Sequence, residues 1–83
     1  MRDRLHSPEY REFLRRLRAK RLEVGLTQQD VARRLGTTQA YVSKSERGER
    51  RVDAVELMDF AEVYGCPLMD LLPERRPRKG KRV

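Results

Sequence analysis

The order of helix caps and glycines between Thr27 and Gly48 constrains the fold of this chain more than any other feature. Thr27, with Asp30 three residues later, resembles a capping box in which Asp replaces Glu or Gln, so we expect a helix to begin at Gln28. Gly36 stands directly after the apolar stripe of that helix, where a glycine takes a left-handed conformation without steric cost. The pattern predicts a short amphipathic helix that ends in a tight turn.

A second short helix is predicted after this turn. Thr38 is placed to cap a helix that starts at Gln39, and Gly48 is placed to end it. The inward face of this helix carries Val42, Ser45 and Glu46. The outward face carries Gln39, Ala40, Ser43, Lys44 and Arg47. Two short helices joined by a glycine turn, the second with a polar outer face, are the parts of a helix-turn-helix.

This motif and its flanks resemble a known family. Ala32, Gly36 and Val42 are spaced by four and six residues, as close packing of the two helices requires. From about Leu14 to Leu72, and most specifically in the segment GLTQQDVARRLGTTQAYVSKSERG, the sequence resembles the Cro/cI-type family, the lambda repressor-like DNA-binding domains also called XRE regulators. The resemblance implies a compact all-α fold of five helices, with the helix-turn-helix at helices 2 and 3 and the third helix in the major groove of B-DNA.

Three further helices are expected around the motif. Ser7 as cap and Pro8 at the first helical position predict a helix over residues 9–24. Asp53 and Glu56 form a second capping pair, which predicts a helix over residues 54–64. A last short helix is expected over residues 68–72.

Charge divides the chain into three parts. Residues 1–52 carry 14 basic and 7 acidic side chains, residues 53–73 carry five acids and no base, and residues 74–83 carry six bases and one acid. We expect residues 1–7 to be a flexible arm, residues 8–73 to be the DNA-binding domain, and residues 74–83 to be a disordered basic tail. A basic body followed by an acidic segment suggests one face directed at a polyanion, although such charges can also be solvated faces only.

Several classes of protein are not expected from this composition. One cysteine and one histidine exclude an internal disulfide and a Cys/His zinc site. The sequence has no metal-ligand set, no nucleophile–base pair and no glycine-rich phosphate loop, so neither an enzyme, a cofactor nor a small-molecule ligand is expected. Without a long apolar run or a signal peptide, we expect a soluble, cytoplasmic protein of prokaryotic or phage type, associated with the nucleoid and not with a membrane.

The resemblance implies base-reading roles on the outward face of the second motif helix. The amide of Gln39 can bond adenine N6 and N7, and Lys44 can donate to guanine O6 or N7 or to a phosphate. Ser43 is a short donor or acceptor, and Ala40 can contact a thymine methyl group. Gln28 is expected to hold a phosphate at a helix N-terminus. The other candidates for the DNA backbone are Thr38, Tyr41, Arg47, Arg50 and Arg51.

Arg21 lies on the otherwise apolar stripe of the first helix, where an unpaired charge would be very costly. Glu46 on the inward face of the second motif helix is the obvious partner, and the family resemblance points to the same pair. We expect this ion pair to be structural. Two departures from the family, Ser45 and Lys20, are expected to thin the core between helices 1 and 3.

The apolar positions of the helix over 54–64 cover more than one stripe. They fit either a helix packed on two neighbours or one that also meets a second subunit. The candidates for such a dimer contact are Leu57, Phe60, Leu68 and Leu71.

The sequence favours a sequence-specific, double-stranded DNA-binding transcriptional regulator, acting as a repressor and a homodimer on a pseudo-palindromic operator. One alternative is the antitoxin of a toxin–antitoxin pair, which would add a toxin as protein partner. Another is a non-specific nucleic-acid-binding protein, for which charge alone would supply the affinity.

Overall fold

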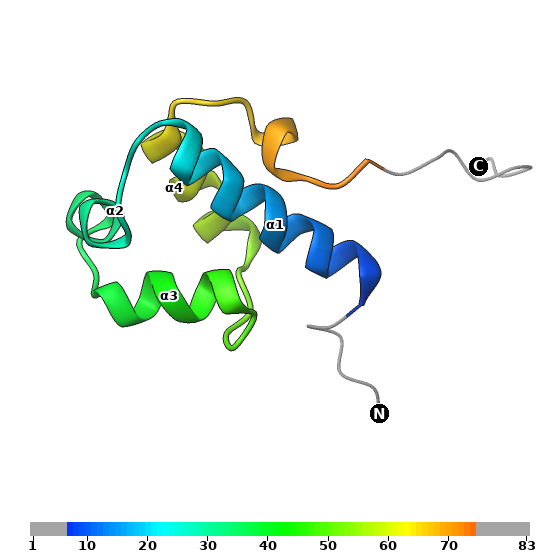
Figure 1. Ribbon diagram of the computed structural model, residues 1–83, viewed down its shortest axis with the longest axis horizontal. Helices are drawn as coiled ribbons and strands as arrows, with labels where there is room; N and C mark the ends of the chain where they lie inside the picture. Colours follow the sequence, from blue (N-terminus) through cyan, green and yellow to red (C-terminus); the bar gives the residue numbers. More distant parts are fainter. Residues whose placement is uncertain (1–6, 75–83) are drawn as a thin grey trace, which may run out of the picture.

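The computed structural model describes residues 7–74, and these residues form an all-helical domain (Figure 1). Its elements are α1 (Pro8–Glu23), α2 (Gln28–Leu35), α3 (Gln39–Arg47), α4 (Ala54–Tyr64) and the 3-10 helix η2 (Leu68–Leu71). The helix starts predicted at Gln28, Gln39 and Ala54 are confirmed, and α1 begins and ends one residue earlier than expected. The predicted N-terminal arm, residues 1–7, and the predicted basic tail, residues 74–83, lie outside the described residues except for Ser7, which caps α1, and Glu74.

The predicted caps set these boundaries. Thr27 Oγ1 accepts a hydrogen bond from Asp30 N at 3.0 Å, and the Asp30 carboxylate accepts one from Thr27 N at 2.9 Å, which completes the capping box. Asp53 and Glu56 form the same reciprocal pair at the start of α4. At the turn between α2 and α3, Gly36 has φ +73°, a conformation that side chains with a Cβ rarely adopt.

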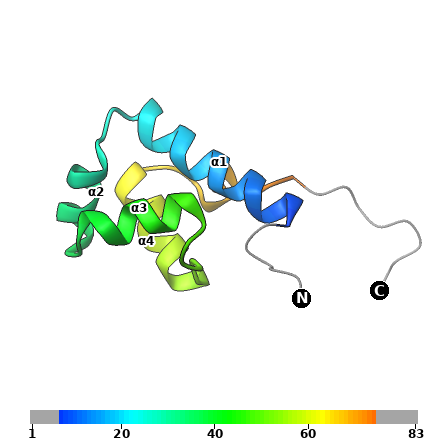
Figure 2. The same ribbon diagram turned by 60° about the horizontal axis from the view of Figure 1, so that its bottom comes forward.

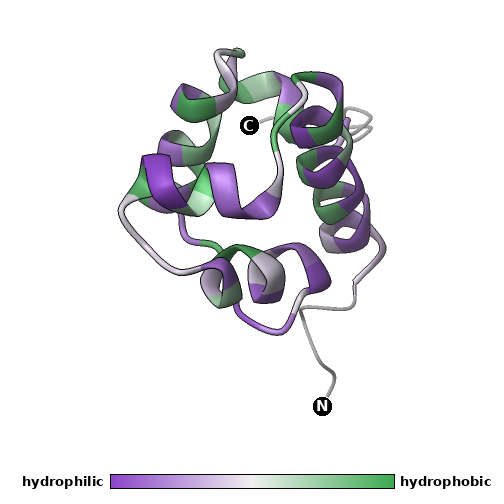
Figure 3. Cartoon of the chain, turned by 60° about the vertical axis from the view of Figure 1, so that its left-hand side comes forward, coloured by the Kyte–Doolittle hydropathy of each residue, from purple (hydrophilic) through white to green (hydrophobic). Residues whose placement is uncertain are grey.

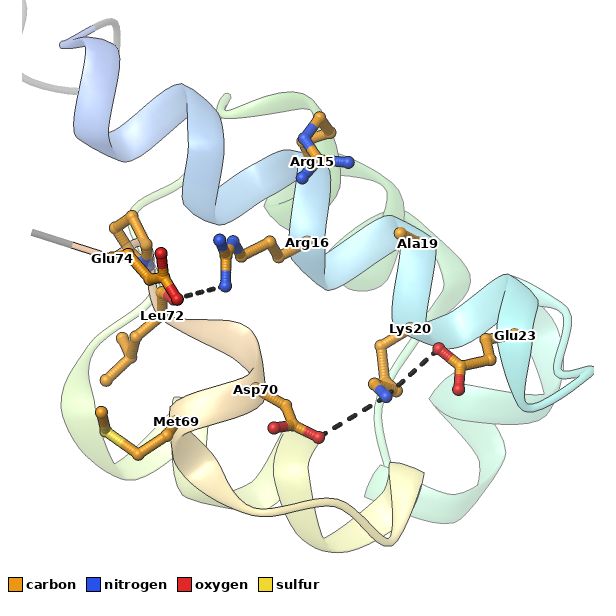
Figure 4. A pocket seen from close by; sticks show the side chains of 10 residues that line it. Arg15, Arg16, Ala19, Lys20, Glu23, Met69, Asp70, Leu72 and Glu74 are labelled. Atoms are coloured by element: carbon orange, nitrogen blue, oxygen red, sulfur yellow. Dashed lines mark hydrogen bonds and ion pairs between the residues drawn. The ribbon is translucent and has the colours of Figure 1, made fainter.

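The last element differs from the prediction, because it is a 3-10 helix and not a fifth α-helix. A segment of four residues that follows Pro67 and is soon stopped by Pro73 cannot complete the hydrogen-bonding pattern of an α-helix. Two cationic side chains of α1 hold this segment against α1, as Figure 4 shows. Arg16 Nη1 donates to Leu72 O at 3.0 Å, and Lys20 Nζ lies 3.6 Å from the Asp70 carboxylate.

Lys20 therefore does not thin the core between α1 and α3. Its side chain lies on the α1 face that meets η2 and also pairs with Glu23 at 3.2 Å. The expectation for this position is wrong, because the sequence pattern did not reveal the two acids that place the ammonium group at the domain edge.

One hydrophobic core joins all five elements. Its side chains are Phe13, Leu17, Val31, Ala32, Val42, Phe60, Ala61, Tyr64 and Leu71. Seen with α2 in front, hydrophobic segments of the helices face one another and hydrophilic segments face outward (Figure 3). Among residues 7–74, no helix is both long and apolar enough to cross a membrane.

Burial corrects two of the four dimer candidates. Phe60 and Leu71 are fully buried in the domain core, so neither side chain reaches the surface. Leu57 is half-buried and Leu68 is exposed at the edge of η2. Among residues 7–74, the apolar side chains most open to solvent are instead Val55, Met58 and Met69, with 66%, 58% and 72% of their surface exposed. The apolar count of α4 could not distinguish its inner side chains from its outer ones.

Candidate nucleic-acid interface

Helix α3 lies at the surface of the domain, with α1 running beside it (Figure 2). Its inward side chains, Val42, Ser45 and Glu46, are buried, as the sequence predicted. Gln39, Ala40, Lys44 and Arg47 are exposed, and Ser43 is half-buried. The structure therefore brings the four proposed base-reading side chains to one accessible helix.

A buried ion pair fixes α3 against α1. Arg21 Nε donates to Glu46 Oε2 at 2.6 Å and Arg21 Nη2 donates to Glu46 Oε1 at 3.1 Å. The two side chains are only 8% and 3% exposed. Arg21 Nη1 also donates to Leu26 O at 3.0 Å, so the guanidinium joins α1, α3 and the loop before α2. Glu46 raises the pKa of Arg21, and the pair predicted from the sequence is present.

Gln28 extends this pair to the surface. Gln28 Nε2 donates to Glu46 Oε1 at 3.0 Å, and Gln28 Oε1 accepts a hydrogen bond from Gln39 Nε2 at 3.2 Å. A continuous network thus runs from the buried Arg21 to Gln39 at the start of α3. Sequence reasoning placed Gln28 near a phosphate but missed its contact with Gln39, because the two residues are 11 positions apart and lie on different helices.

Arg47 belongs to a second network on the outer face of α3. Its Nε and Nη2 atoms each donate to the Glu49 carboxylate at 3.0 Å, and its Nη1 atom donates to Ser43 Oγ. The guanidinium lowers the pKa of Glu49. Part of the positive charge of Arg47 is therefore compensated within the domain, which sequence reasoning did not anticipate.

Arg50 and Tyr41 hold the loop after α3 against α4. The Arg50 guanidinium lies 4.2 Å from the centre of the Tyr41 ring and donates to the Glu56 carboxylate at 2.8 and 3.2 Å. It also donates to Ser45 Oγ at 3.2 Å, and this buried hydroxyl in turn donates to Tyr41 O at 2.7 Å. These contacts give Arg50 and Tyr41 a structural role besides the DNA-backbone role proposed from the sequence.

Some cations remain available for a ligand. The side chains of Arg18, Arg34, Lys44 and Arg51 are exposed and form no hydrogen bond or ion pair with residues 7–74. Lys44 and Arg51 flank the C-terminal end of α3. Thr38 Oγ1 accepts a hydrogen bond from Tyr41 N at 3.1 Å, and this cap leaves its hydroxyl proton free to donate. No group of three or more His, Cys, Asp or Glu side chains within residues 7–74 is placed to hold a metal ion.

Comparison with known sequences supports this geometry. A family model described as helix-turn-helix matches residues 17–71. Over 52 residues the chain is 38% identical to the uncharacterized HTH-type transcriptional regulator y4dJ of Sinorhizobium fredii, covering 63% of this chain and 68% of that protein. Over 53 residues it is 36% identical to an uncharacterized transcriptional regulator in the ATPase CF(0) region of Rhodospirillum rubrum, covering 64% of this chain but about half, 49%, of that protein.

Solved structures share the fold. An XRE-family like protein from Pseudomonas syringae superimposes with a TM-score of 0.75 at 40% identity, over 81% of this chain and 82% of the other. The restriction-modification controller protein C.AhdI from Aeromonas hydrophila gives 0.69 at 33% identity, over 74% and 92%. The DNA-binding domain of BldD gives 0.73 at 32% identity, over 81% and 97%. The chain therefore belongs to the helix-turn-helix family of DNA-binding transcriptional regulators, and within it to the Cro/cI-type, or XRE, proteins.

Proposed function

We propose that this protein represses transcription by binding a specific double-stranded DNA sequence, with α3 in the major groove. The observation that carries the proposal is that α3 has two different faces. One face is polar and accessible, and the other is buried and held in place by the Arg21–Glu46 ion pair. A rigid helix with exposed hydrogen-bonding side chains can read base edges in a groove about 12 Å wide. The XRE relatives support this assignment.

The side chains on α3 define the expected base contacts. Gln39 bonds adenine N6 and N7, Lys44 donates to guanine or to a phosphate, and Ala40 contacts a thymine methyl group. Ser43 is held by Arg47, so its hydroxyl is oriented before DNA arrives. We therefore expect sequence preference at a few adjacent base pairs in each half-site.

Backbone contacts position α3 in the groove. Gln28 and Thr38 stand at the N-terminal ends of α2 and α3, where backbone N–H groups and the helix dipole favour a phosphate. Arg51 supplies an uncompensated charge from the loop that follows α3, whereas Arg47 shares its charge with Glu49. Arg51 is thus a stronger candidate for phosphate contact than Arg47.

We further propose that the protein acts as a homodimer on a pseudo-palindromic operator. One domain reads only a short half-site, and a second copy related by a two-fold axis doubles the site and its affinity. Exposed apolar side chains on α4 and η2, including Leu68, Val55 and Met58, offer surface for such a contact. C.AhdI, a restriction-modification controller protein of the same fold, is a comparable small regulator. Repression requires only occupancy of a promoter, which a DNA-binding domain alone provides.

The test is selection of bound sequences from a random duplex pool at about 150 mM salt, where non-specific charge attraction is weakened. Recovery of an inverted repeat with half-site centres about one helical turn apart would support a dimeric, sequence-specific protein. A reporter gene with that repeat across its promoter then tests repression, and a scrambled repeat is the control. Binding without a recovered motif, lost as salt rises, would contradict the proposal and favour non-specific binding.

A further inference from the structure

Three arginines form a row on the exposed side of α1. Arg11, Arg15 and Arg18 are spaced by four and three residues, so they lie on one face of the helix, and all three are exposed. They line a shallow groove between α1 and the C-terminal half of α3, and Arg47 lies on the α3 side of the same groove. The row is separate from the outer face of α3 but borders it.

The three arginines differ in how far other groups of the domain neutralise their positive charge. Arg18 forms no hydrogen bond or ion pair with residues 7–74. Arg15 donates to the Glu12 carboxylate at 2.8 and 3.0 Å, but its side chain is 65% exposed and Glu12 is shared with Arg16. Exposed ion pairs of this kind contribute little stability, so the Arg15 guanidinium can readily exchange the Glu12 carboxylate for another anion. Arg11 also has an interaction partner, so it is not counted as a free charge. The net positive charge that the row leaves open to solvent therefore lies at Arg18 and, in part, at Arg15.

The position of α1 beside α3 indicates which anion would meet this row. Packed helices have axes about 8–10 Å apart, and the major groove is about 12 Å wide. When α3 occupies the groove, a helix packed at its side lies over the groove edge, where the phosphates are. Arg11 and Arg18 are about 10 Å apart along the helix, which equals the rise of about three nucleotides of one strand measured along the DNA axis.

We propose that Arg11, Arg15 and Arg18 form a second DNA-binding surface, which binds the phosphate backbone beside the major groove that α3 enters. This inference rests on the proposed function, because it requires α3 to dock in the major groove. It predicts a footprint that extends past the bases read by α3. The surface adds affinity and salt dependence but no sequence preference, since phosphates are the same in every sequence.

The experiment measures the affinity of the full chain for its selected duplex at several salt concentrations from 50 to 200 mM. Arg18→Ala should lower the slope of log affinity against log salt by about 0.9, and Arg11→Ala, Arg15→Ala and Arg18→Ala together by up to about 2.7. Alanine favours helix, so the variants should keep the fold, which circular dichroism checks. The sequence selected from a random pool should not change.

Arg34→Ala is the matched control. Arg34 is also an exposed helical arginine without a hydrogen bond or ion pair to residues 7–74, but it lies on α2 and does not line the groove. Its removal should change the slope by much less than removal of Arg18. Equal effects of the two variants would overturn the proposal in favour of diffuse attraction by net charge.

Two further outcomes separate the inference from the proposed function. Wild-type protein that binds a selected sequence, with no change of slope in the triple variant, would overturn the second surface alone and direct attention to an acidic protein partner. Wild-type protein without sequence preference would overturn the proposed function and this inference together. Ethylation interference adds a direct readout. Ethylation of phosphates at the groove edge should weaken binding of the wild-type protein, and this weakening should be absent in the triple variant.

Discussion

Gln39 Nε2 donates a hydrogen bond to Gln28 Oε1 at 3.2 Å, and this contact links the first residue of α3 to the first residue of α2. Gln28 in turn donates to Glu46, the buried partner of Arg21. The orientation of the Gln39 side chain at the surface is thus set through Gln28 by the buried Arg21–Glu46 pair. Restricting the Gln39 amide in this way lowers the entropy lost when it bonds a base.

We expect Gln28→Ala to reduce sequence discrimination, although Gln28 itself is not proposed to read a base. The change removes the acceptor that orients Gln39 and a donor to Glu46, and each such hydrogen bond contributes about 1 kcal/mol. The affinity ratio between the selected duplex and a scrambled duplex should fall. Gln29→Ala, an exposed neighbour on α2, is the control and should leave the ratio unchanged. The same ratio in both variants would mean that the network does not act on recognition.

Gln39 and Arg51 should separate sequence reading from phosphate binding. Gln39→Ala is expected to cost about 1–3 kcal/mol for the preferred base at one position and to relax the preference there. Arg51→Ala is expected to weaken binding to all sequences alike and to lower the salt slope by about 1. Competition titrations with single-base variants of the operator measure both effects. An unchanged preferred site after Gln39→Ala would mean that another face of the domain reads the DNA.

The Arg21–Glu46 pair should dominate the stability of the contact between α1 and α3. Arg21→Met or Glu46→Leu alone leaves a buried charge without its partner, which costs about 3–5 kcal/mol. The double variant removes both charges, so its loss in free energy of unfolding should be well below the sum of the single losses. Urea denaturation of the four proteins measures this coupling. Additive losses would show that the two charges do not stabilise each other.

The sequence predicted the elements of this domain well because their ends depend on local chemistry. Thr27, Asp53 and the glycines that follow α2 and α3 act on residues within one turn, so cap and turn rules locate them. The Arg21–Glu46 pair was also predictable, since a charge on an apolar stripe demands a partner.

Contacts between distant segments were predicted less well. The pairing of Lys20 with Asp70 and the contact of Arg50 with Tyr41 depend on how elements pack, and no local rule specifies that packing. The Gln28–Gln39 contact was missed for the same reason. For α4 the composition gave two possible faces, and only the fold shows that Phe60 points inward while Val55 and Met58 point outward.

Acid should weaken the first turns of α1 through Glu12. Hydrogen bonds from Arg15 and Arg16 lower the pKa of Glu12 from 4.5 to about 2. Because the folded pKa lies below the unfolded value, the unfolded chain binds the proton more readily, and the stabilisation is present above about pH 4.5 and lost as the pH falls towards 2. Thermal unfolding of wild type and Glu12→Gln across this range tests it. Their difference in Tm should be small, because solvent screens these exposed ion pairs, and it should be constant above pH 5 and vanish near pH 2. A difference that persists in acid would contradict the assignment.

Tyr64 gives the opposite kind of test, because removing a polar group should stabilise the domain. Its side chain is buried against Phe60, and its hydroxyl has no hydrogen-bond partner within residues 7–74. An unsatisfied buried hydroxyl costs about 1–3 kcal/mol, so Tyr64→Phe should raise the free energy of unfolding or leave it unchanged.

Tyr10→Phe is the control for this change. The Tyr10 hydroxyl accepts a hydrogen bond from Val52 N at 3.0 Å, so its removal leaves a backbone donor unpaired and should destabilise the domain by about 1 kcal/mol. Urea denaturation of the two variants should therefore give shifts of opposite sign, or a loss in Tyr10→Phe alone. A clear loss of stability in Tyr64→Phe would mean that the Tyr64 hydroxyl forms a favourable hydrogen bond in solution.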